Sequence, residues 1–249
     1  MSQPSPERIV AAAAAAAPQD AHAQTFAPTE WAGVTRRLLG VVRRESASGR
    51  ESPVVQVALL DLAPGAAWRP PEEGGFEAFV LSGGAVVGGV EHAAGSYLRQ
   101  PAQAAGEASA ISSTSGSRLL VRSGPGLSVH ALLAVPTARE PWRKGQGNLR
   151  VMPLFSQDQE GTALVHWPAG ERFQPHRHWG GEEIFVLSGT FQDEHGQYPA
   201  GTWILSGHKS VHHPFVDEET VILVKTGHLL QAPDRPAPEL PSARPTPRA

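Results

Sequence analysis

The chain has 249 residues and a formal net charge of −3, and 40% of its residues are hydrophobic. This composition can supply a real core, argues against wholesale disorder, and shows no polybasic surface of the kind that binds nucleic acid or anionic lipid. Cysteine is absent, which excludes disulfides, cysteine nucleophiles, iron–sulfur clusters and thiolate zinc sites. Any metal site must therefore be built from histidine, aspartate and glutamate.

The two ends are predicted to be tails. Residues 1–27 carry a run of seven alanines and little else that could pack, and six prolines follow residue 232. Proline at that density is incompatible with helix or interior strand. No apolar stretch approaches the roughly 20 residues needed to cross a bilayer. We therefore expect disordered termini, no membrane partner and a cytoplasmic location.

Between the tails the sequence predicts short strands bounded by turn residues. These segments are apolar, often β-branched, and bounded by Gly, Pro, Asp or Ser. No segment after residue 40 sustains a helical period. The 26 glycines and 23 prolines suit such a turn-rich chain. In chain order, the strands are expected at residues 54–62, 78–81, 119–122, 129–133, 149–154, 163–166, 183–187, 203–205 and 221–225.

The middle of the chain repeats itself. Residues 77–83, EAFVLSG, return 106 residues later as EIFVLSG, with six of the seven residues identical. Three further matches occur in the same order at spacings of 103 to 106 residues. Ordered matches at near-constant spacing indicate a duplicated domain. With strands this short, each copy is expected to be a small antiparallel barrel or jelly roll, one at 28–136 and the other at 137–231.

The second copy carries residues with metal-ligand chemistry. His176 and His178 are two apart, so in a strand they point to the same face. Gly180 and Gly181 allow a tight turn, after which Glu182 can return to that face from the next strand. His212 would arrive from a later strand. Three imidazoles and one carboxylate make a good site for zinc or a first-row divalent metal.

These residues also resemble a known family. The pattern Gly170-x5-His176-x-His178-x3-Glu182-x6-Gly189 fits the first cupin motif, and Pro199-x-Gly201 through His212 resembles the second. The words GGEEIFVLSGTF, PAGTW and HHPF look most like the ChrR-like cupins, a domain found in zinc-binding anti-sigma factors and in some non-haem dioxygenase relatives. The resemblance is strong over 137–231 and reaches 28–136 through the repeat. It implies an all-β fold of two tandem cupin barrels.

The resemblance also implies a ligand set. The metal ligands would be His176, His178, Glu182 and His212, and the cofactor one divalent ion, Zn or Fe(II), with Mn or Ni as further options. Glu182 is preferred to Glu183 because its spacing to Gly189 fits the motif, and His212 is preferred to its neighbour because the family pattern is His-x-Pro. The other histidines of this half are expected in solvent or beside the ligands: His166, His195, His208, His213 and His228.

The first copy has lost these residues. Depending on the gap, His176 aligns with Pro70 or Pro71, and Glu182 with Phe76 or Glu77. His178 aligns with Glu72 or Glu73, which are most simply exposed loop carboxylates. The N-terminal barrel is therefore predicted to be a degenerate, structural half without a metal site.

Two functions fit the predicted centre. Iron(II) there would resemble cupin dioxygenases that cleave carbon–carbon bonds in diketones or hydroxyketones, whereas zinc would suit a ChrR-like sensor that binds a small molecule or a partner protein without turnover. A purely structural zinc ranks third. No residue is identified as a general base, so the catalytic residues are unknown. The residues expected to line a substrate pocket are Arg172, Phe173, Trp179 and Trp203.

The expected partners are a small-molecule ligand and a second copy of the chain, because exposed sheet edges favour self-association. A sigma factor is not expected. ChrR-type regulators grip it with an N-terminal helical domain whose zinc site uses cysteine, and the 27 residues before the repeat leave no room for such a domain.

Overall fold

The computed structural model describes residues 25–43, 54–71, 74–101, 110–125, 127 and 131–229. Of the expected tails at 1–27 and 232–249, residues 1–24 and 232–249 lie outside these residues, as do Glu72 and Glu73, whereas Ala27 belongs to a short strand. The all-β prediction is confirmed: within the described residues the chain forms strands and a single short 3₁₀ helix. These residues contain no helix long and apolar enough to cross a membrane.

The first half of the chain forms a ten-stranded sheet in the order β1-β2-β3-β9-β5-β7-β10, with β4, β6 and β8 paired beside this path. The 13-residue strand β5 pairs with β9 and β7 through its first part and with β6 and β8 through its last part. The bounds are β1 (Ala27–Pro28), β2 (Val34–Arg43), β3 (Val54–Leu62), β4 (Ala67–Trp68), β5 (Gly75–Val87), β6 (Val90–Ala93), β7 (Ser96–Gln100), β8 (Ile111–Ser112), β9 (Ser117–Gly124) and β10 (Leu133–Pro136).

The second half forms a six-stranded sheet, β11-β12-β13-β20-β15-β18, which faces two small pairs, β14-β19 and β16-β17. The 3₁₀ helix η1 (Thr137–Arg139) precedes it. The bounds are β11 (Arg143–Lys144), β12 (Arg150–Gln157), β13 (Glu160–Trp167), β14 (His176–Arg177), β15 (Glu182–Ser188), β16 (Thr190–Asp193), β17 (Gly196–Pro199), β18 (Trp203–Ser206), β19 (Val211–His212) and β20 (Thr220–Thr226).

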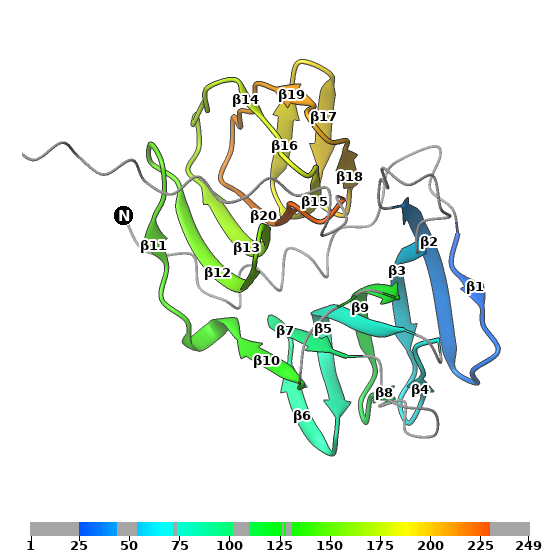
Figure 1. Cartoon of the computed structure of the whole chain (residues 1–249). Coiled ribbons are helices and arrows are strands. Elements are labelled where there is room, and N and C mark those ends of the chain that lie inside the picture. The colour runs from blue at the N-terminus through cyan, green and yellow to red at the C-terminus, as the bar shows by residue number, and fades with distance from the viewer. Residues whose placement is uncertain are drawn as a thin grey trace, which may run out of the picture.

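The two halves stack one above the other and are joined by the chain from β10 to β11 (Figure 1). Each half has its own apolar core, one around Trp68 and Phe76 and the other around Trp167 and Phe191. A third cluster contains buried side chains from both halves, such as Phe79 and Phe185. Because side chains alternate along a strand, one face of each large sheet packs inward and the other packs against the opposite half.

Charged side chains also meet between the halves, and they do so in a crossed arrangement. Lys225 Nζ lies 2.9 Å from Glu77 Oε2, and Arg122 Nε lies 3.2 Å from Glu183 Oε2. Glu77 and Glu183 occupy the same place in the repeat, as do Arg122 and Lys225. Each half therefore presents an acid and a base, and each pairs with the other half's opposite charge, as in an interface with twofold symmetry.

All nine expected strands overlap observed ones, one of them at a single residue. Several observed strands are absent from the expected set; the longest is β2, in which a register shift between Leu38 and Gly40 breaks the alternation of apolar and polar residues. The strand expected at 129–133 begins only at Leu133, and residues 128–130 lie outside the described residues.

Candidate metal centre

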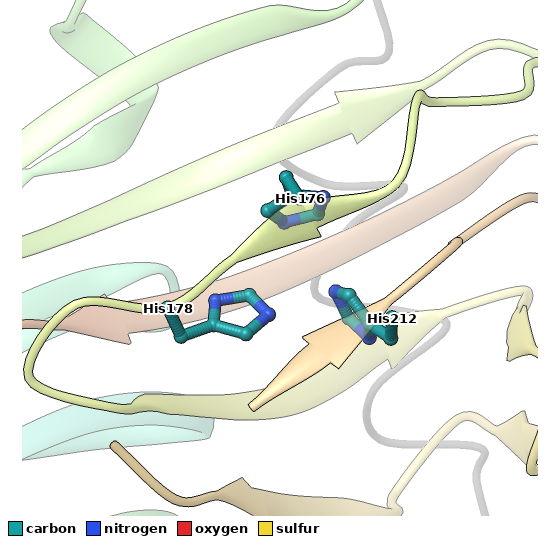
Figure 2. A group of neighbouring side chains, drawn as sticks. All are labelled: His176, His178 and His212. Carbon is teal, nitrogen blue, oxygen red and sulfur yellow. The ribbon is translucent and has the colours of Figure 1, made fainter. Parts of the chain in front are cut away.

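Three histidines converge between the large sheet and the small pairs of the second half. His176 and His212 sit opposite each other in the β14-β19 ladder, and His178 follows β14 in the next turn. One nitrogen from each ring lies within 4.8 Å of the others, and the ring centroids are 4.6 to 4.8 Å apart. Figure 2 shows the three rings turned toward a common space. Such a group can hold a metal ion.

The turn after β14 is held by backbone hydrogen bonds and by two glycines. The His178 amide donates to the Ser210 carbonyl at 3.0 Å, and the Lys209 amide donates to the His178 carbonyl at 2.8 Å. Gly180 and Gly181 both have φ near +77°, a conformation that side chains disfavour. These contacts tie the loops that carry His178 and His212 to each other.

Glu182 approaches the same space from the first residue of β15. Its Oε2 lies 3.4 Å from His178 Nδ1, and its Oε1 lies 3.7 Å from His212 Nε2. It does not belong to the group whose ligand atoms all lie within 4.8 Å of one another, but it borders two of its three members. Glu183, one residue on, points to the other face of the strand and meets Arg122 of the first half.

Burial favours the uncharged form of His178 and His212. Desolvation, reinforced by His212 and His176, lowers the pKa of His178 to about 4. Desolvation also lowers the pKa of His212, against the opposing hydrogen bond to Asp193. Burial raises the pKa of Glu182 to about 8. A neutral imidazole is the form that binds a metal, and a buried carboxyl of this kind would be ionised by a nearby cation.

Two buried atoms of this centre lack a partner. His178 Nε2 and Glu182 Oε1 accept or donate no hydrogen bond within the described part of the chain. Burying an unpaired nitrogen or oxygen is costly unless something else satisfies it. A divalent cation bound by imidazole nitrogens and a carboxylate oxygen would satisfy both, so the donor set fits a metal.

Residues 130–230, which include all of these side chains, match the family model described as the ChrR cupin-like domain. The C-terminal half is a ChrR cupin-like domain. The match does not extend over the first half of the chain. That half is related to the matched region only through the internal repeat of the sequence. No curated protein matches the sequence.

Several solved structures resemble the whole two-part chain. A candidate glyoxylate-induced protein from Pseudomonas aeruginosa is 12% identical, with 81% of this chain and 83% of that chain covered and a TM-score of 0.62. A candidate dioxygenase from Nostoc punctiforme is 15% identical, with 82% and 76% covered and a TM-score of 0.61. Oxalate decarboxylase from Bacillus subtilis is 14% identical, with 80% and 73% covered and a TM-score of 0.56. At these identities the likeness establishes the cupin fold.

Within the ChrR cupin-like domain, the four residues expected to line a pocket lie in different places. Phe173 packs edge-on against His176, with ring centroids 5.1 Å apart. The Arg172 side chain is 63% exposed and lies over the Phe215 ring. Trp179 is 45% exposed and packs edge-on against His208. Of the four, Phe173 is the one found against a histidine of the group.

Trp203 faces away from the histidines because of its position in strand β18, where successive side chains point to opposite faces of the sheet. It pairs with Phe185 in the β15-β18 ladder, and both side chains pack in the cluster between the two halves. There the indole ring fills the space beside Gly40, where an added Cβ would overlap it. Trp203 thus joins the halves and does not line the metal centre.

The other histidines of this domain also divide by position. His213 is exposed, and its amide donates to Glu194. His195 is exposed and His208 half-buried, as expected. His166 and His228 correct the expectation, because both are buried away from the three histidines. His166 packs against Trp142, and His228 lies 3.4 Å from Glu183 at the contact between the halves.

The first half has an apolar side chain where the ChrR cupin-like domain has its carboxylate. Phe76 pairs with Gln100 and Ser123, as Glu182 pairs with Ser206 and Thr226, so Phe76 is the structural counterpart of Glu182. It is fully buried and contacts Trp68 edge-on at 6.2 Å. No second metal-ligating group occurs among the described residues.

The structure adds one residue that the sequence did not suggest. Asp193, at the end of β16, places Oδ2 3.3 Å from His212 Nδ1. It precedes His212 by 19 residues in a polar hairpin turn, and nothing in that spacing marks it as a partner of His212.

A cavity of about 20 Å³, enough for one water molecule, lies between the halves and not at the histidines. Its polar lining includes Glu77, Tyr97 and Thr162.

Proposed function

We propose that this chain is a metal-dependent dioxygenase for a small diketone- or hydroxyketone-like substrate, with one divalent ion held by His176, His178, Glu182 and His212. The observation that carries the proposal is the group of three imidazoles, with one nitrogen from each within 4.8 Å of the others, bordered by a buried carboxyl group. A divalent ion with four protein ligands keeps positions for a chelating substrate and dioxygen, and acts as a Lewis acid and a template.

The surrounding side chains suit such a centre. Phe173 packs against His176 and Phe191 lies 6.1 Å from His212, so aromatic rings exclude water from one side of the histidines. His176 remains half-buried where the other two are buried, which gives a small molecule a side from which to approach. A site for a small molecule requires an apolar lining and one side that the molecule can reach.

The test begins with the metal. We expect the purified chain to hold one divalent ion, to form a nitric oxide adduct with Fe(II) under anaerobic conditions, visible by electron paramagnetic resonance, and to consume oxygen with a member of a diketone and hydroxyketone panel. The His213→Ala variant serves as the matched control. A chain that retains no divalent metal would contradict the proposal at its base.

A second candidate is a zinc-binding sensor without turnover, which the match of residues 130–230 to the ChrR cupin-like domain favours. In that case the metal would stabilise a barrel that binds a small molecule or a partner protein. Tight stoichiometric zinc, no nitric oxide adduct and no oxygen uptake would select the sensor over the dioxygenase.

A further inference from the structure

The side chain of Asp193 contacts His212 on the side of the ring away from Glu182. It is 5% exposed, and its Oδ2 lies 3.3 Å from His212 Nδ1. A carboxylate can only accept, so the hydrogen of a neutral His212 ring sits on Nδ1. The other nitrogen, Nε2, then carries a free electron pair. It is also the nitrogen that lies toward Glu182, at 3.7 Å.

The other oxygen of Asp193 is held in place by three donors. Oδ1 accepts from the amides of His195 at 2.8 Å and Gly196 at 3.2 Å, and from the Tyr198 hydroxyl at 3.0 Å. Two of these donors are backbone groups of the β16-β17 hairpin and cannot be turned into acceptors. The carboxylate therefore has a fixed orientation, with Oδ2 always toward His212.

His176 has a comparable contact of a different kind. Its Nδ1 lies 3.2 Å from the backbone carbonyl oxygen of Gln174, which also only accepts. Both rings thus direct Nε2 into the centre, but the His176 contact belongs to the backbone whereas the His212 contact depends on one side chain. A partner on the distal nitrogen of a metal-binding histidine fixes its tautomer and orientation.

We propose that Asp193 is a positioning residue that holds His212 in the Nδ1–H tautomer, so that Nε2 is free to bind the ion. The inference rests on the proposed metal centre and adds a residue to it that makes no contact with the metal. It predicts that a side chain of the same size as Asp193 cannot replace it unless an acceptor oxygen faces the imidazole of His212.

The decisive variant is Asp193→Asn, which keeps the size of the side chain. The two backbone amides require an oxygen at the Oδ1 position, so the new NH₂ group must occupy the Oδ2 position and donate to His212 Nδ1. The imidazole hydrogen then moves to Nε2, which faces the centre and can no longer bind a metal. We expect the affinity for Zn(II), measured against a competing chelator at constant pH, to fall by about 10- to 100-fold.

A second readout does not involve the metal. Long-range ¹H–¹⁵N correlation spectra of the metal-free protein distinguish the two tautomers of His212, and we expect Nδ1–H in the wild type and Nε2–H in Asp193→Asn. A role in folding alone would not exchange the tautomer. The melting temperature of the metal-free variant should stay close to that of the wild type, because the hairpin contacts to Oδ1 are kept.

Two controls separate the effect from charge and from the hairpin. Asp217→Asn removes a nearby carboxylate that contacts Gln192, and Tyr198→Phe removes a donor from Oδ1 without touching the imidazole. Both should bind Zn(II) within about threefold of the wild type. Wild-type affinity and tautomer in Asp193→Asn, or an equal loss in Asp217→Asn, would overturn the role of Asp193 alone. Absence of metal binding by the wild type would instead overturn the proposed function.

Discussion

Single residues in the second half differ sharply from their immediate neighbours. Glu182 borders His178 and His212, whereas Glu183 meets Arg122 across the contact between the halves. His212 is buried in the histidine group, whereas His213 is exposed. The pleat of a strand turns successive side chains to opposite faces. One-residue shifts therefore decide which side chain can act in the metal centre.

The adjacent histidines give a direct test at this scale. We expect His176→Ala and His212→Ala each to abolish metal retention, because each removes a nitrogen that no other described side chain can replace at that point. His213→Ala should retain the metal, since its ring lies in solvent. Metal content after dialysis against a chelator measures both effects. Equal loss from His213→Ala would show that the assignment of the ligand is wrong.

His228 makes a prediction about pH. Burial, with a contribution from Arg122, lowers its pKa from 6.5 to about 4. The folded state therefore resists a proton that the unfolded state accepts, so this contribution to stability is complete above pH 6.5 and is lost as the pH falls toward 4. The difference corresponds to roughly 3 kcal/mol. Urea denaturation of the metal-free protein between pH 7 and pH 4 measures it.

The matched variants are His228→Gln and His195→Gln. The first removes the buried titrating group, so the unfolding free energy should fall less steeply with acid than in the wild type. The second removes a ring whose side chain is 67% exposed, and its curve should follow the wild type. Identical pH slopes in all three proteins would exclude His228 as the source.

At the scale of elements, the turn between β14 and β15 decides whether the histidines and Glu182 can meet. Gly181 has φ +77°, and a Cβ added there would overlap the Leu229 side chain and approach the Ser206 carbonyl oxygen at 3.0 Å. The turn therefore requires glycine both for its backbone conformation and for its packing. The turn connects β14, in the pair with β19, directly to β15 of the six-stranded sheet.

We expect Gly181→Ala to destabilise the protein by about 2 kcal/mol or more, because strain at positive φ adds to the overlap. It should also weaken metal binding by displacing β15. Gly170→Ala has the same positive φ with nothing within 4 Å of the added Cβ, so it isolates the backbone strain. Chemical denaturation should rank the loss as Gly181→Ala above Gly170→Ala; equal losses would exclude the overlap as a cause.

Apolar, often β-branched runs bounded by turn residues were enough to predict the main strands of both halves. Recurrence of the same word located β5 and β15, and the histidine spacing pointed to the β14 turn. β2 escaped because its irregular register near Gly40 removes the alternation. Asp193 escaped because only the folding of the β16-β17 hairpin onto β19 brings it to His212. The position of Trp203 between the halves could not be read from the sequence, since the direction of its side chain depends on the register with Phe185.

At the scale of the whole molecule, a buried ionic cluster holds the halves together. Lys225 Nζ lies 2.6 Å from Glu160 Oε1 and 2.9 Å from Glu77 Oε2, and all three are buried. Although burial alone would raise it, the charges of Lys225 and Arg99 hold the pKa of Glu160 down to about 2. The carboxylates are thus ionised wherever the protein is folded, and they depend on their cations.

Removing the shared cation should therefore be costly. Lys225→Met leaves Glu77 and Glu160 short of a positive charge in a buried place, and we expect a loss of about 3–5 kcal/mol in the free energy of unfolding. Lys144→Met removes a lysine from an exposed edge and should change it by less than about 0.5 kcal/mol. Equilibrium unfolding in urea compares them. A small loss in Lys225→Met would show that the cluster contributes little.

The crossed pairs between the halves have a consequence for how small this protein could become. Glu183 and Lys225 each reach an opposite charge on the other half, Arg122 and Glu77, in addition to a partner in their own half. A chain trimmed to its metal-bearing portion would expose both side chains and remove Arg122 and Glu77 from them. It could neutralise them against another copy of itself, since acid and base occupy matching places. A second half, tied by the same backbone or supplied by a separate chain, is thus what completes this charged surface.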